Sequence, residues 1–279
     1  MDRFLKTTFC SAMLLISSTY IAKAADPITE TPERKMVTVT AEETGNDWHF
    51  VLTPYIWATG LSGDVSPFRQ APRVHVDQSF SDILENLNIA GFVNLYAGNG
   101  QYGIYADMMY VSTSESGGTG PVTLPGLGSV RGVDIGVDSE LFAGALFGSY
   151  RLVNTDQLTV DALAGVRAFN VWTKVKAAIP SQGLSTEAES NFGWIDPAVG
   201  ADFKYHVNDR FDIVGQADIG GFSAGSDLTW QAMAAVKYQM TQTSALSFGY
   251  KYMSVNYDDD GHVFDTEFQG PMLGVSFRF

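Results

Sequence analysis

From Trp48 to the C-terminus, apolar and polar residues alternate along most of the chain. A period of two places successive side chains on opposite faces of an extended strand, and Phe211, Asp212 and Ile213 begin one such run. Turn-forming residues divide this part of the chain into ten alternating segments, which predict ten strands. They are residues 48–58, 89–98, 101–112, 133–151, 158–174, 191–206, 211–222, 228–240, 245–257 and 266–279.

The connections between the predicted strands alternate in length. Those on one side are short, and Asn99-Gly100 predicts a type I′ hairpin turn. Of the five on the other side, four are long: residues 62–88, 114–132, 177–190 and 258–265. Short periplasmic turns and longer extracellular loops are typical of outer-membrane barrels. We therefore predict an all-β fold, a single antiparallel up-and-down transmembrane barrel of about ten strands with both termini in the periplasm.

The long connection at 62–88 leaves the strand number open. Val74-His75-Val76 would fit another strand pair, giving twelve strands, while residues 81–87 predict one or two helical turns with Ser81 as the N-cap. The connection at 114–132 is rich in glycine but has no following helix or suitably placed lysine, so it predicts a mobile extracellular loop rather than a phosphate-binding loop.

Alternation alone does not separate a membrane barrel from a soluble β-sandwich, and the last strand supplies the distinction. Leu273, Val275, Phe277 and Phe279 share one face, and Phe279 ends the chain. A terminal aromatic residue preceded by apolar residues at every second position resembles the signal that the barrel-assembly machinery of outer membranes reads. These four residues are therefore the predicted assembly signal.

The N-terminus predicts export. Residues 1–24 combine Arg3 and Lys6, a short apolar stretch and Ala22-Lys23-Ala24, the pattern of a cleaved signal peptide. Cleavage would remove Cys10, the one cysteine, so the mature chain would form no disulfide. Residues 25–47 are polar and predict a flexible periplasmic segment, or a small plug or partner-binding strand within it. The predicted location is the outer membrane of a Gram-negative bacterium.

Several phrases resemble a large, functionally uncharacterised family of proteobacterial outer-membrane β-barrel proteins. They are residues 52–58 (LTPYIWA), 80–87 (FSDILENL), 196–201 (DPAVGA), 220–231 (GGFSAGSDLTWQ) and 249–252 (GYKY) with 257–259 (YDD). The resemblance covers residues 48–279. It implies the barrel fold and the outer-membrane location, and it transfers no activity and no functional residue.

Strand parity directs a set of charged side chains into the predicted lumen. A small barrel leaves little internal space, so charges of both signs would form a packed salt-bridge network, line a narrow pore for small solutes, or hold a catalytic site. The predicted lumen charges are Asp107, Glu140, Asp161, Arg167, Asp202, Lys204, Asp212, Asp218, Lys237, Lys251 and Arg278.

Catalytic and metal sites have weak support in the sequence. His75 and His262 are expected on the extracellular side, and a Ser-His-acid site would need one of them, for example His262 with Asp260 or Asp265. No serine stands in a nucleophile motif, so we predict no enzyme and no cofactor. Asp258, Asp259, Asp260 and Asp265 form an acidic loop, a weak candidate for Ca²⁺ or Mg²⁺ or for lipopolysaccharide-bridging cations, and otherwise a solvated turn.

Charge and the predicted location together limit the partners. A formal net charge of −14 argues against nucleic acid. The expected partners are outer-membrane lipid and lipopolysaccharide, with the barrel-assembly machinery during biogenesis, and the oligomeric state stays open. The first functional hypothesis is a structural or surface protein with a packed or narrow polar lumen. The alternatives are a porin-like channel for small solutes and, less favoured, an outer-membrane hydrolase acting on lipid or peptide.

Overall fold

The computed structural model describes residues 48–279 apart from 70, 120–121, 125–127, 131–132 and 181–182. The predicted signal peptide, Cys10 and the predicted periplasmic segment at 25–47 lie outside the described residues. Among the described residues, no helix has the length and apolar character needed to cross a bilayer.

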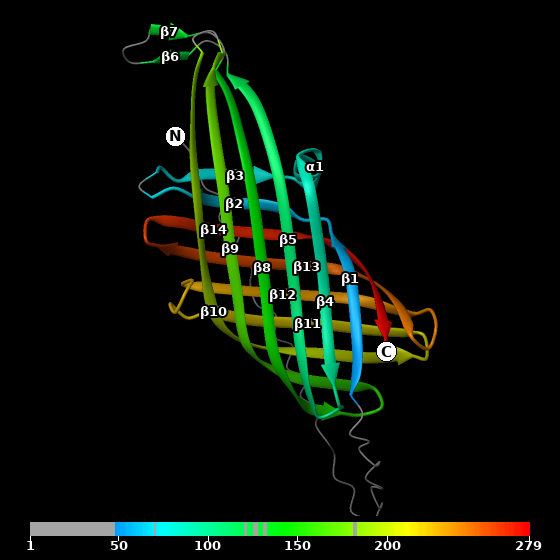
Figure 1. The fold of residues 1–279 in the computed structure, drawn as a ribbon. Coiled ribbons are helices and arrows are strands. Elements are labelled where there is room, and N and C mark those ends of the chain that lie inside the picture. The colour runs from blue at the N-terminus through cyan, green and yellow to red at the C-terminus, as the bar shows by residue number, and fades with distance from the viewer. Residues whose placement is uncertain (1–47, 70, 120–121, 125–127, 131–132, 181–182) are drawn as a thin grey trace, which may run out of the picture. The chain divides into compact units, whose positions relative to one another are not determined.

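Ten strands pair with their neighbours in chain order and close into an antiparallel barrel (Figure 1). They are β1 (His49–Trp57), β4 (Leu87–Gly98), β5 (Tyr102–Thr119), β8 (Val133–Asn154), β9 (Leu158–Ile179), β10 (Leu184–Asn208), β11 (Phe211–Gly221), β12 (Leu228–Gln239), β13 (Ser244–Asp259) and β14 (His262–Arg278). All ten predicted segments are strands of this barrel, so the predicted fold and strand number are confirmed.

The barrel closes between its first and last strands. Val51 of β1 lies opposite Arg278 of β14, and the register continues to Trp57 opposite Met272. Beyond β14, the Phe279 N–H donates to the Phe50 carbonyl over 2.9 Å. The chain ends at the barrel end that holds the short turns, which we call the short-turn end; the opposite end is the long-loop end.

Two further strands lie outside the closed ring. β2 (Gly60–Ser66) continues the line of β1 along β14, after a break at Ala58 and Thr59. β3 (Val74–Gln78) pairs with β2 only. The extra strand pair considered in the sequence is therefore present as β2 and β3. The alternative of twelve barrel strands is nevertheless wrong, because β2 and β3 take no part in closing the ring.

A short helix, α1 (Phe80–Glu85), follows β3. Its N-cap is Ser79 rather than the predicted Ser81, because Ser79 and Asp82 have the three-residue spacing of a capping box. The Asp82 N–H donates to the Ser79 hydroxyl oxygen, and the Asp82 carboxylate accepts from the Ser79 N–H over 2.9 Å. The hydrogen bonds from Ser79 hold the pKa of the Asp82 carboxyl below its usual value.

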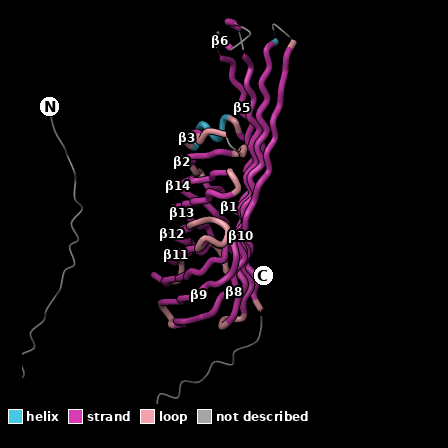
Figure 2. Tube along the Cα trace, turned by 90° about the vertical axis from the view of Figure 1, so that its left-hand side faces the viewer, coloured by secondary structure: helices cyan, strands magenta, loops and turns pink. Residues whose placement is uncertain are grey.

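Four strands extend beyond the others at the long-loop end (Figure 2). β8 stays paired with β5 from Val133 and with β9 to Ala178, and β9 pairs with β10 from Leu184. Much of the loops predicted at 114–132 and 177–190 is therefore strand, because unbroken backbone pairing carries these polar segments outward. Beyond β5, the short strands β6 (Val122–Leu124) and β7 (Gly128–Val130) pair with each other.

At the short-turn end, the predicted hairpin at Asn99-Gly100 is confirmed, but its predicted turn type is wrong. A type I′ turn needs a positive φ at both central residues, and among the residues of this turn only Gly100 has one (+90°).

The two faces of the wall differ as the alternation predicts. Large apolar side chains such as Ile56, Leu146 and Phe248 are exposed on the outside, where a membrane barrel meets lipid. Leu273, Phe277 and Phe279 of the predicted assembly signal share this outer face with Pro271 and Val275. Buried charged side chains such as Asp107, Arg167 and Lys251 face the lumen.

Gly270 of β14 lies against the break between β1 and β2. A Cβ atom there would lie 2.0 Å from the Ala58 carbonyl oxygen. We expect Gly270→Ala to lower the free energy of unfolding by about 1–3 kcal/mol, because backbone must move to relieve the clash. Urea unfolding in detergent micelles measures this change. Gly91→Ala is the control, because a Cβ at Gly91 meets nothing within 4 Å, and equal losses in both variants would contradict the packing argument.

Candidate functional site

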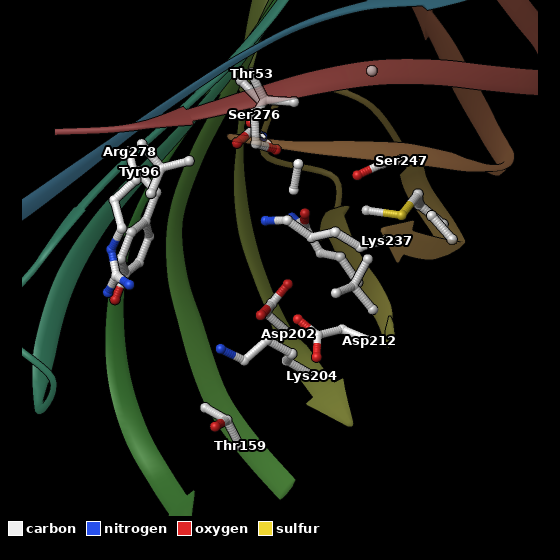
Figure 3. Close-up of a pocket in the computed structure, with 18 of the residues that line it drawn as sticks. Thr53, Tyr96, Thr159, Asp202, Lys204, Asp212, Lys237, Ser247, Ser276 and Arg278 are labelled. Carbon is white, nitrogen blue, oxygen red and sulfur yellow. Dashed lines mark hydrogen bonds between the residues drawn. The ribbon is translucent and has the colours of Figure 1, made fainter. Parts of the chain in front are cut away.

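The lumen is divided into two unlike halves. At the short-turn end, a polar cavity of about 840 Å³, which we call the chamber, is lined by residues of all ten barrel strands and by the turns at 156–157 and 209–210. Its lining includes Asp202, Lys204, Asp212 and Lys237, whose side chains gather on one side of the cavity (Figure 3). Since the short turns form its rim, the chamber opens at the short-turn end.

At the long-loop end, buried aromatic rings fill the lumen. We call this cluster the aromatic plug; it consists of Tyr55, Trp57, Phe169, Trp194, Tyr257, Phe264 and Phe268, with Met109, Ala143, Val171, Met253 and Val255. The ring of Trp194 on β10 stacks on Tyr257 of β13 at 4.0 Å and on Phe169 of β9 at 4.8 Å. β10 and β13 are not neighbours in the barrel, so the Trp194–Tyr257 stack joins two strands that β11 and β12 separate, beyond the ends of both.

Asp196 fixes the strand that carries Trp194. Its carboxylate is fully buried and accepts hydrogen bonds from the Ser226 N–H (2.7 Å), the Ser226 hydroxyl (2.7 Å) and the Thr229 hydroxyl (2.9 Å). The indole N–H of Trp194 donates to the same carboxylate over 3.3 Å. The connection between β11 and β12 is thereby tied to β10, directly beside the plug.

An ion pair lies where the chamber meets the plug. The Lys251 ammonium donates to Asp107 over 2.6 Å, and the Tyr55 hydroxyl donates to the same carboxylate over 2.8 Å. The Lys251 Nζ also lies 5.1 Å from the centroid of the Trp57 ring and 5.4 Å from that of Tyr55, within the range of a cation–π interaction. Lys251 therefore takes part both in the ion pair with Asp107 and in the packing of the aromatic rings.

A second buried pair joins β9 and β11. The Arg167 guanidinium donates to Asp218 over 2.6 Å, and both side chains are almost fully buried. Asp161, which the sequence also directed inward, pairs with Arg151, a residue absent from the predicted set. Asp212 lies 2.5 Å from the His206 ring nitrogen. Burial of such charges is tolerated because each has a partner.

The remaining predicted lumen charges fall into two groups. Asp202, Lys204, Lys237 and Arg278 line the chamber and have no ion-pair partner among the described residues. Glu140 differs from the prediction and faces outward: it shares its face of β8 with the exposed Phe142 and Leu146, and it hydrogen-bonds to Tyr110 on the outside of β5. Phe147 points inward, and β8 has no bulge between Phe147 and Glu140. Because these two residues are an odd number of positions apart, their side chains lie on opposite faces of the strand.

The sequence analysis did not identify the plug or Asp196 as lumen features. Trp194, Asp196 and Ala198 occupy alternate positions of β10 and all face inward. Asp202 was predicted to face the lumen, and every second residue before it in the same strand shares its face. This alternation would therefore have placed Trp194 and Asp196 inside the barrel. It would not have shown that the ring of Trp194 reaches β13.

The acidic loop candidates do not converge on a metal site. Asp260 pairs with Arg69, and Asp258 accepts a hydrogen bond from Arg73 over 2.6 Å. In the described part of the chain, no three or more His, Cys, Asp or Glu side chains group as metal ligands do. Asp259 and Asp265 belong to no such group.

The two histidines considered for catalysis have structural contacts. His262 is buried, its Nδ1 lies 2.9 Å from the Pro67 carbonyl oxygen, and its ring stacks on Phe192 at 4.5 Å. The contacts described for His262 join it to neither Asp260 nor Asp265. His75 is exposed and lies 2.8 Å from Asp64. Neither histidine is joined to a serine and a carboxylate in these contacts.

The buried pair of Lys251 and Asp107 gives a prediction for stability. Lys251→Met leaves Asp107 buried without its cation, and we expect the free energy of unfolding to fall by about 3–5 kcal/mol. Arg73→Met removes one positive charge from the exposed pair with Asp258, and there we expect a loss of about 0–1 kcal/mol. Urea unfolding of both variants measures the difference, and a Lys251→Met protein as stable as Arg73→Met would contradict the importance of the buried pair.

Comparison with known proteins supports the fold. The outer membrane protease OmpT from Escherichia coli, whose crystal structure is known, is 12% identical to this chain. The two structures align with a TM-score of 0.52 over 84% of this chain and 98% of that chain. The translocator domain of the autotransporter NalP from Neisseria meningitidis is 9% identical, with a TM-score of 0.45 over 85% of this chain and 90% of that chain. At such identities the likeness to OmpT concerns the fold alone.

A family model adds a sequence match. No curated protein matches the chain. Residues 144–277, which run from the middle of β8 to near the end of β14, match a family described as "Protein of unknown function, DUF481". With the barrel fold, this match shows that the chain resembles a functionally uncharacterised family of outer-membrane β-barrel proteins.

Proposed function

We propose that this protein is a non-conducting outer-membrane barrel with a structural or surface role, whose lumen the aromatic plug closes. The stack of Trp194 on Tyr257 carries this proposal, because it joins two non-neighbouring strands on the inside of the wall with rings whose centres are 4.0 Å apart. Trp57 and Phe268 add a second aromatic contact at 6.2 Å. A solute has no polar path through such a cluster.

The proposed orientation places the short-turn end in the periplasm and the four-strand extension at the cell surface. The short turns, the end of β14 and the start of β1 all lie at the same end, as in barrels whose termini are periplasmic. Export by a cleaved signal peptide at 1–24 and contact of the outer face with lipid and lipopolysaccharide belong to the same proposal. The exposed apolar outer face supports the contact with lipid.

The proposed role is not catalytic. His262 is one of the two histidines that the sequence analysis considered for a Ser-His-acid site. Its ring contacts the Pro67 carbonyl oxygen and stacks on the Phe192 ring. A porin-like channel would need a displaced plug, and the charged pair of Lys251 and Asp107 is buried against that plug. The packed lumen is therefore the favoured hypothesis over the pore and the hydrolase.

Planar-bilayer recording tests the closed lumen. We expect the refolded protein to show no discrete openings, because the plug excludes water from the long-loop half of the lumen. Trp57→Ala combined with Trp194→Ala removes two rings from the plug and should produce openings. Trp230→Ala, which removes a ring from the outer face, is the matched control and should stay silent.

Openings in the unmodified protein that change in conductance or ion preference with Lys237→Glu would overturn this proposal in favour of a pore. Lys237 lines the chamber, so its charge would lie beside any continuous path. Silence of the unmodified protein and of Lys237→Glu agrees with a closed barrel.

Assembly provides a separate test of location. We expect Phe279→Ser to reduce the amount of folded protein in the outer membrane several-fold, because it removes the terminal aromatic residue of the predicted assembly signal. Phe248→Ser is the matched control: Phe248 is also an exposed outward phenylalanine, but it lies within β13. Heat-modifiable gel mobility of outer-membrane fractions measures assembly, and equal loss in both variants would show a general effect of outer-face polarity instead.

A further inference from the structure

Three cations in the strands that line the chamber have no ion-pair partner among the described residues. Asp107, Asp161 and Asp212 are each held by a cation or a histidine ring within the lumen. Lys204, Lys237 and Arg278, on three different strands, have no ion-pair partner among the described residues. Lysine and arginine side chains donate only, so these three offer donors without an internal acceptor.

A buried amide adds a fourth donor. The Nε2 atom of Gln216 is buried and has no hydrogen-bond partner in the described structure, although Gln216 lines the chamber and is only 4% exposed. Buried polar groups are normally satisfied, so an unpartnered amide at the wall of a cavity indicates a missing acceptor. Water or a ligand would supply it.

Apart from the exposed rim residues Asp156 and Asp209, Asp202 is the chamber carboxylate without an ion-pair partner among the described residues. It interacts electrostatically with Lys204 and Lys237, and the three side chains lie together in the chamber (Figure 3). Among the strand residues that line the chamber, the unpaired cations Lys204, Lys237 and Arg278 thus outnumber the unpaired carboxylate Asp202, although the protein as a whole has a net charge of −14.

The surroundings of these donors strengthen their attraction for an anion. Lys204 and Lys237 are partly buried within the barrel, and charges interact more strongly where water is excluded. A volume of about 840 Å³ lies within the range of small-molecule sites. The plug closes the far end, so a solute would enter and leave at the short-turn end.

We propose that the chamber binds a small anion that carries a phosphate or carboxylate group, with Lys204, Lys237 and Arg278 as its cationic contacts and Gln216 as a neutral donor. Asp202 opposes binding and limits affinity. This inference goes beyond the proposed closed-barrel role, and only the compartment from which the anion comes rests on the proposed orientation.

Isothermal titration calorimetry on the full chain refolded in detergent micelles tests the site, with inorganic phosphate and succinate as separate probes at constant ionic strength. We expect at least one probe to bind. Lys237→Gln should weaken its affinity by 10-fold or more, because one of the three cations is lost. Asp202→Asn should strengthen it several-fold, because the opposing carboxylate is lost. Opposite effects of these two variants would show that the bound species is an anion, and an exposed control separates a built site from general charge attraction.

Lys176→Gln is the matched control. It makes the same charge change, but Lys176 is exposed and paired with Asp138, and it does not line the chamber. We expect its affinity to equal that of the unmodified protein. Displacement of bound phosphate by phosphatidylglycerol in the micelle would identify a lipid headgroup as the source of the anion, and its failure would identify a free solute.

Two results would overturn the inference: no binding of either probe to a protein whose folding is verified by heat-modifiable gel mobility, or equal weakening by Lys237→Gln and Lys176→Gln. Conductance through the unmodified barrel would contradict the closed-lumen role but leave anion binding in place. The two proposals therefore fail separately.

Discussion

Inside a lipid bilayer, a backbone N–H or C=O group without a partner costs several kcal/mol, and this constraint determines the whole structure. The chain meets it by pairing each barrel strand with the next and the last with the first. The hydrogen bond from the Phe279 N–H to the Phe50 carbonyl belongs to this closure. Because β1 and β14 pair, the first and last strands of the ring leave no open edge along their paired residues.

A closed ring of ten strands encloses a space that side chains must fill, and this protein fills its two halves differently. Aromatic rings pack the long-loop half, where Trp194 of β10 stacks on Tyr257 of β13. Charged side chains line the short-turn half, where the chamber remains. Lys251 lies at the boundary: it neutralises Asp107 and rests against the Trp57 ring, so the polar half ends on the packed half without an unpaired charge.

The charges in the lumen also separate into satisfied and unsatisfied groups. Arg167 with Asp218 and Lys251 with Asp107 are buried pairs whose contribution is structural. Lys204, Lys237 and Arg278 line the chamber and have no ion-pair partner among the described residues. A purely structural lumen would be expected to pair these cations, and their surplus is the reason to infer an anion site within a barrel that otherwise has the features of a closed scaffold.

Alternation and turn residues predicted the ten strands and the direction of β14 because period two and short turns are local properties of the chain. Parity also placed Asp107, Arg167 and Lys251 in the lumen. The plug was not predictable in this way, since Trp194 and Tyr257 are 63 positions apart in the numbering and their contact depends on how far β10 extends beyond β11. The error at Glu140 has a local cause, because the inward face of β8 is the one that holds Phe147.

Liposome swelling tests most directly whether the plug closes the lumen. Liposomes that contain the refolded protein are placed in an isotonic solution of a small neutral solute such as glycine or arabinose, and the rate of swelling is followed by light scattering. A lumen closed by Trp57, Trp194 and Tyr257 predicts the same rate as protein-free liposomes. Swelling that is faster than in protein-free liposomes, and that slows as the solute grows larger, would contradict a closed lumen.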